Sequence, residues 1–120
     1  MAEEILIVYA TFPNADTART IVGTLVEEGL IACGNLIPNV ESIYRWQGTV
    51  QAATEVFGIM KTTRSCLIAL AERYRAMHPY QVAEFLTVTV EDGLPDYVRW
   101  IEDTCAPVAT SATWAGPVLR

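Results

Sequence analysis

The chain has 120 residues, of which 52% are hydrophobic and only 18% charged, and its net charge at pH 7 is −6. This length suits one domain with a single core. Because lysine and arginine are scattered through an acidic chain, no basic surface is predicted and we expect no nucleic-acid partner. The low charge content predicts that another subunit covers part of the surface.

Two further observations concern the cell compartment. No apolar stretch reaches the roughly 20 residues of a transmembrane helix, so we expect no membrane association. Residues 1–4 include two glutamates where a secretory signal would be positively charged, and we therefore expect a cytoplasmic protein. Cys33, Cys66 and Cys105 are widely spaced, which is typical of neither a disulfide framework nor a zinc knuckle.

The first third of the chain predicts a strand followed by a helix. Residues 5–12 form a nearly continuous apolar run, as expected of a strand buried on both faces. Asn14 is a plausible N-cap for a helix that ends at Gly29, a residue suited to a left-handed C-terminal position. The apolar residues that recur at helical spacing between them are Ala18, Ile21, Val22, Leu25 and Val26.

A long hairpin is predicted next. Its first strand begins at Leu30 and runs to Trp46, with Pro38 indicating a bulge or an edge position because proline cannot donate to a ladder. Residues 47–49 form the turn, and residues 54–61 return as the second strand.

The remaining elements are a helix, a strand and a short helix. Thr62 and Thr63 offer a cap for the first helix, and its apolar stripe consists of Leu67, Leu70, Ala71 and Tyr74. Residues 84–90 alternate as a strand. Pro95 stands near the first turn of the last helix, whose apolar side consists of Leu94, Tyr97, Val98 and Ile101.

The order of elements predicts an α+β fold. A βαββαβ order with right-handed crossovers gives a ferredoxin-like sandwich, with helices on one face of the sheet and here an additional C-terminal helix. Residues 56–60 are apolar on both strand faces, so the open face needs an identical subunit as a second cover. We expect one domain over residues 1–105. The tail, residues 106–120, is expected to be partly mobile, to lie along a neighbour, or to add an edge strand at 112–115.

His78 is the only histidine and stands where the predicted helix stops at Pro79. It could be a metal ligand or a packed helix end. Tyr44 and Trp46 alternate on one strand face, where they could line a pocket or anchor a subunit interface. Cys33 could be a thiolate or a buried small side chain.

Charged residues in the strands need partners as well. Glu55, Lys61 and Glu84 could pair across the sheet, or Lys61 could border an intersubunit cleft that admits an anion. The single histidine has no serine or cysteine beside it, so no catalytic residue is predicted.

Five segments together resemble the CutA divalent-cation tolerance family. They read ACGNLIP at 32–38, SIYRWQG at 42–48, EVFGIMKTT at 55–63, HPYQ at 78–81 and YVRWI at 97–101. The resemblance implies a homotrimer of ferredoxin-like subunits around a three-fold axis, a cytoplasmic location, and a link to copper and other divalent metals. It also implies similarity to PII signalling proteins, which bind effectors in clefts between subunits.

Four positions depart from the family pattern. Ala10 stands where some members have cysteine, and Met77 where some have a second histidine, so strong metal donors are missing. Gln81 replaces the usual glutamate, and Ala83 replaces a proline.

The sequence therefore predicts a non-catalytic, trimeric protein that responds to divalent metal ions, copper first, with His78 as the candidate metal ligand. No cofactor is expected apart from copper or another divalent metal. The alternative is a PII-like module that binds a small anionic effector. Tyr44 and Trp46 are predicted interface residues, and the predicted cleft residues are Lys61, His78, Tyr80, Gln81 and Glu84.

Overall fold

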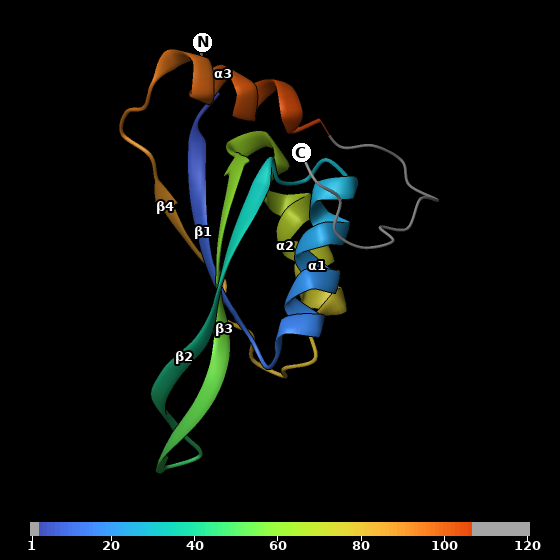
Figure 1. The fold of residues 1–120 in the computed structure, drawn as a ribbon. Coiled ribbons are helices and arrows are strands. Elements are labelled where there is room, and N and C mark those ends of the chain that lie inside the picture. The colour runs from blue at the N-terminus through green and yellow to red at the C-terminus, as the bar shows by residue number, and fades with distance from the viewer. Residues whose placement is uncertain (1–2, 107–120) are drawn as a thin grey trace.

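The computed structural model describes residues 3–106, which form a two-layer α+β sandwich (Figure 1). All strand pairs are antiparallel, and the sheet order is β2-β3-β1-β4, as the predicted ferredoxin-like fold requires. The elements are β1 (Ile5–Phe12), α1 (Ala15–Glu27), β2 (Cys33–Trp46), β3 (Thr49–Thr63), α2 (Leu67–Met77), β4 (Leu86–Thr89) and α3 (Pro95–Thr104). The edge strand expected in the tail lies outside the described residues.

Helix α1 begins and ends as its sequence predicts. The Asn14 side chain accepts a hydrogen bond from the Thr17 backbone N–H at 2.8 Å, which satisfies one of the free donors of the first turn. At the other end Gly29 has a φ of 73°, and the Leu30 N–H donates to the Leu25 carbonyl. This pair of features is a Schellman motif.

The motif also explains a wrong strand boundary. Residues 30–32 were predicted to open the second strand, but β2 starts at Cys33 because Leu30 still belongs to the helix cap. Thr62 fixes the segment from the other side, since its hydroxyl donates to the Leu30 carbonyl at 2.7 Å. Thr62 is therefore not a helix cap, and a short 3₁₀ turn (Arg64–Cys66) precedes α2.

The β2-β3 hairpin is bent by a bulge on its edge strand. The register between β2 and β3 shifts between Ile37 and Val40, where Asn39 has a φ of 60°. Gln47 and Gly48 also have positive φ angles and form the two-residue turn at the tip. Beyond the bulge the hairpin extends past the helices, and most of its residues are exposed (Figure 1).

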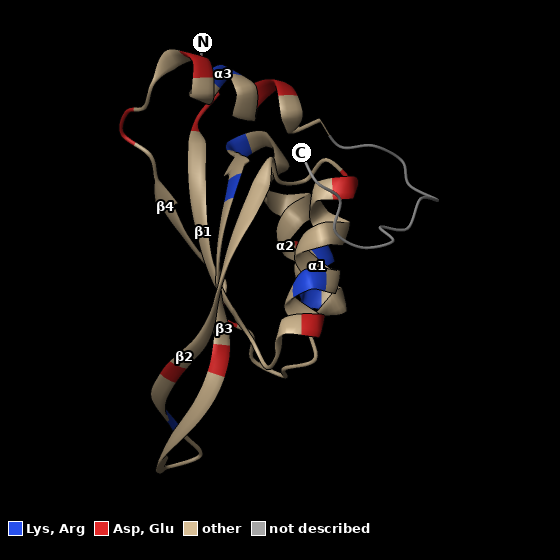
Figure 2. Ribbon diagram, in the orientation of Figure 1, with Lys and Arg blue, Asp and Glu red and all other residues tan. Residues whose placement is uncertain are grey.

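Helices α1 and α2 cover only one of the two faces of the sheet. Helices α1 and α2 pack on one face over a core that includes Phe12, Leu25, Met60 and Leu70. On the opposite face the Tyr9 and Phe57 rings stack at 5.6 Å, and neither α1 nor α2 covers them. The neighbouring strands add exposed Ile37 and Leu86. Few strand residues are charged (Figure 2), and the four side chains named here make the middle of the open face apolar.

The last strand is shorter than the predicted one over residues 84–90. Strand β4 pairs with β1 only over Leu86–Thr89, because residues 78–85 form the loop that leads from α2 to the sheet edge. Helix α3 has Pro95 in its first turn, as predicted, and buries Ile101 against Ile5 and Cys66. None of the described helices is both long and apolar enough to cross a membrane.

Candidate functional site

A groove of about 750 Å³ lies between the outer half of the hairpin and the loop that follows α2. Tyr44, Trp46 and Glu55 line it from the hairpin, and Tyr80 and Glu84 line it from the loop. The remaining lining residues are Thr11, Ser42, Ile43, Gln51, Pro79, Gln81 and Val82. The groove thus gathers most of the predicted cleft residues with the predicted interface pair.

The bulge decides which hairpin side chains face the groove. Before the bulge Ile37 pairs with Phe57, and after the bulge Tyr44 pairs with Gln51. The extra residue therefore reverses which residues of β2, odd-numbered or even-numbered, lie on a given face of the sheet. Tyr44 and Trp46 consequently share a face with Glu55 rather than with Val56, which points into the core.

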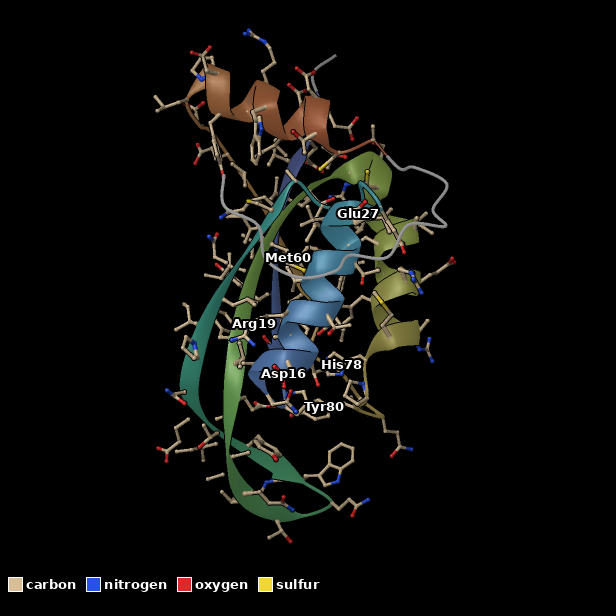
Figure 3. All side chains as sticks on the ribbon, turned by 45° about the vertical axis from the view of Figure 1, so that its right-hand side comes forward. Asp16, Arg19, Glu27, Met60, His78 and Tyr80 are labelled. Atoms are coloured by element: carbon tan, nitrogen blue, oxygen red, sulfur yellow. The ribbon has the colours of Figure 1, made fainter. Side chains whose placement is uncertain are left out.

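His78 lies behind the groove and is 8% exposed. Its Nε2–H donates to the Thr11 carbonyl at 2.8 Å, and its Nδ1 accepts from the Tyr80 backbone N–H at 3.1 Å. The ring also stacks on Phe12 at 5.5 Å and contacts Tyr74 at 5.1 Å. Figure 3 shows His78 beside Tyr80 at the lower ends of the helices. His78 therefore joins β1 to the loop.

The donor set does not fit a metal ion at His78. A histidine ligand offers a ring nitrogen lone pair, and here the Nδ1 lone pair already accepts from Tyr80 while Nε2 carries the proton. Within residues 3–106 no three side chains of histidine, cysteine, aspartate or glutamate are placed to hold a metal. Ala10 and Met77, at the two positions where some family members have cysteine and a second histidine, carry neither a thiolate nor an imidazole.

Two carboxylates shape the electrostatics of the groove. Glu55 is 8% exposed and accepts a 2.6 Å hydrogen bond from the Tyr80 hydroxyl. Burial, followed by that bond, raises the pKa of Tyr80, so the hydroxyl remains a donor. Burial and the charge of Glu55 also raise the pKa of Glu84. Among residues 3–106 no lysine, arginine or histidine lines the groove, so the two carboxylates give it a negative field.

Lys61 is not near this groove within the protomer. It pairs in register with Ile7 and Cys33 and donates to the Asn35 side chain. At about 3.3 Å per residue, six residues along β3 place it about 20 Å from Glu55. Cys33 is half-buried there, and its Sγ lies 3.7 Å from the Tyr97 hydroxyl. Within the protomer Lys61 therefore lies at the other end of β3 from the groove, and its place in a cleft between subunits stays a prediction.

Glu84 gives the groove a measurable pH dependence. Its pKa is raised above the ordinary 4.5, so the folded state binds more protons than the unfolded state between the two pKa values. The contribution of Glu84 to the free energy of unfolding therefore decreases as the pH rises from the lower pKa to the higher one. We expect Glu84→Gln to raise the Tm at pH 7. The corresponding gain in the free energy of unfolding is less than about 1 kcal/mol.

The same substitution is expected to leave the Tm unchanged near about pH 4, where the carboxyl is mostly protonated in both states. Thermal melts of both proteins at the two pH values measure the difference. Glu72→Gln, on the exposed side of α2, is the matched control. A Tm gain that is equal at both pH values would contradict this assignment.

Fold and site together define a ferredoxin-like α+β protein with a kinked hairpin and an aromatic, acidic groove. The chain belongs to the CutA1 divalent ion tolerance family, since the family model for the "CutA1 divalent ion tolerance protein" matches residues 6–104.

Individual relatives agree with this membership. Protein CutA of Mus musculus is 41% identical over 105 residues, which are 88% of this chain and 59% of the mouse protein. The divalent-cation tolerance protein CutA of Thermus thermophilus is 41% identical over 101 residues, covering 84% of this chain and 96% of the relative. The chain thus spans well under two thirds of the mouse protein and nearly all of the bacterial one.

Solved structures confirm the fold. The CutA1 structure from Thermus thermophilus superposes with a TM-score of 0.83 at 39% identity, covering 85% of this chain and 99% of that one. CutA1 from Oryza sativa gives a TM-score of 0.85 at 34% identity, covering 88% and 96%.

Proposed function

We propose that this protein is a non-catalytic homotrimer that acts in the cytoplasm in the tolerance of divalent metal ions, with copper as the first candidate. The match of residues 6–104 to the divalent ion tolerance family carries the proposal. The relatives from Thermus thermophilus and Pyrococcus horikoshii are named divalent-cation tolerance proteins.

The apolar open face supports the trimer. Large apolar side chains such as Ile37, Leu86 and Val88 are 46%, 63% and 45% exposed in the protomer. A contiguous exposed apolar sheet face needs a cover, and symmetric association of identical chains provides it.

The hydrogen bonds of the His78 ring support a non-catalytic role. It is the only imidazole in the chain, and both of its nitrogens have backbone partners in a buried position. A general base needs a free lone pair within reach of substrate, which this ring does not offer. The anionic-effector alternative receives less support, because the described residues that line the groove include two carboxylates and no basic side chain.

Growth of a bacterial strain that lacks its own CutA-type protein tests the proposal. Expression of this chain is expected to raise the copper concentration that halves growth, relative to the empty vector. A parallel magnesium series is the control, since general osmotic or expression effects would shift both curves. Equal copper sensitivity with and without the chain, at verified expression of folded trimer, would contradict the proposal.

A further inference from the structure

Two cysteines that are far apart in the sequence meet where the end of α3 packs against the start of α2. The Cys66 Sγ lies 3.8 Å from the Cys105 carbonyl oxygen, 39 residues along the chain. Both thiols are free and share one apolar cluster with Ile5, Ala32 and Ile101. They are 1% and 8% exposed. The protomer therefore buries the pair by itself, without the help of a neighbouring subunit.

The two thiols are held in their reduced form. Burial, followed by the neighbouring Cys66 thiol, raises the pKa of Cys105 to about 11, so this thiol is protonated at neutral pH. Cys66 acts on it more strongly than Cys33 does, as the nearer sulfur must. Because the thiolate and not the thiol reacts with oxidants, the pair is protected from disulfide formation. It keeps two sulfur donors for a ligand that can displace a proton.

The number and the softness of these donors select one kind of metal ion. Zinc takes four ligands in a structural site, whereas the described residues place no three acidic, cysteine or histidine side chains to hold a metal. The other members of the cluster are apolar and offer no further donor. Cu(I) prefers soft sulfur ligands and is satisfied by two thiolates. The pair therefore suits Cu(I) better than a divalent ion.

The place of Cys66 in the fold also suits the charge of such a complex. A Cu(I) ion with two thiolates carries one negative charge, which is costly in an apolar cluster. Cys66 is the N-cap residue of α2, an 11-residue helix, and its side chain makes no capping hydrogen bond. The positive end of the helix dipole lies at this position and offsets part of that cost.

We infer that Cys66 and Cys105 form a two-sulfur binding site for Cu(I). On binding, each S–H bond gives up its proton to water and each sulfur forms a bond to the metal, so two protons leave for each ion bound. An ion reaches the pair when the last turn of α3 opens, since Cys105 directly follows that helix. The inference deepens the proposed role in copper tolerance and rests on it for its meaning in the cell.

Anaerobic titration of the reduced, full-length protein with Cu(I), in competition with the coloured chelator bicinchoninate, tests the site. One Cu(I) per chain is expected to pass from the chelator to the protein. X-ray absorption of the loaded protein is expected to show two sulfur neighbours of the metal and no nitrogen neighbour. Retention of all Cu(I) by the chelator, or a nitrogen ligand on the bound metal, would overturn the inference.

Single variants locate the site. Cys66→Ala and Cys105→Ala each remove one sulfur, and each is expected to weaken Cu(I) binding by at least about 100-fold, because outer-shell partners alone contribute about 10- to 100-fold. Cys33→Ala is the matched control and should bind like the wild type, since Cys33 is half-buried on β2 and outside the pair. Unchanged affinity in either folded variant, or an equal loss in Cys33→Ala, would contradict a site made of these two sulfurs.

The oligomer mass and Tm of each variant are measured first, so that weak binding is scored only on folded protein. Where a variant does not fold, the sulfur count from X-ray absorption of the wild type decides. The titration uses purified protein and the growth test uses cells. Cu(I) binding without a growth effect would therefore contradict only the proposed function, and a growth effect without Cu(I) binding would contradict only this site.

Discussion

Replacing Ile59 with lysine is expected to convert the proposed trimer into monomers of about 13.2 kDa. Ile59 lies on β3 between Tyr9 and Asn35 on the open face of the sheet, away from the α1 and α2 core. Each buried aliphatic side chain stabilises an interface by about 1.5 to 3 kcal/mol. Three symmetric copies lose this term, and each lysine adds a desolvation cost.

Size-exclusion chromatography with light scattering measures the outcome. The wild type is expected at three times the chain mass and the variant at the chain mass. Ile68→Lys is the matched control, because Ile68 is 77% exposed on α2, on the helical side of the molecule. A variant that remains trimeric, or a wild type that elutes as a monomer, would remove the open face as the subunit interface.

Replacing His78 with alanine is expected to destabilise the protein by about 2 to 4 kcal/mol. The substitution leaves the Thr11 carbonyl and the Tyr80 N–H without their ring partner, and it opens a cavity beside Phe12. Denaturant unfolding, monitored by fluorescence, gives the change in free energy.

His78→Phe separates the two contributions. Phenylalanine restores a ring against Phe12 and Tyr74 but cannot bond Thr11 or Tyr80. We expect it to recover part of the loss, leaving the roughly 1 to 3 kcal/mol cost of unpaired buried polar groups. If His78→Ala instead left stability unchanged and abolished copper binding, His78 would be a ligand rather than a link between β1 and the loop.

Much of the fold could be predicted from local signals. Asn14 and Gly29 bound α1 through side-chain and backbone bonds that span a few residues, so the sequence contains both the motif and its consequence. The strand start at Leu30 was mispredicted because an apolar triplet reads alike in a strand and in a helix cap. The Thr62 hydroxyl that decides between them lies 32 residues away.

The candidate site could be predicted only in part. Tyr80, Gln81 and Glu84 follow one another closely, and they do share the groove. Lys61 does not line the groove of the protomer, and its place in a cleft between subunits stays a prediction, because one chain does not show which side chains a neighbouring subunit brings near. Thr11 was missed, since its role depends on the end of β1 meeting the loop. The partner of His78 is a backbone carbonyl, a group that every residue has, so the residue type at position 11 could not reveal this bond.

The extra residue at Pro38-Asn39 separates two tasks that one strand would otherwise share. Before this residue, the odd-numbered side chains of β2 lie on the open face of the sheet. After it, the even-numbered side chains lie on that face. Insertion or deletion at this point would turn Tyr44 and Trp46 away from the strand face that carries Glu55, and would place Ile43 and Arg45 on that face, without altering any core residue. A single codon at the kink can therefore change the ligand chemistry of the groove while the fold stays the same.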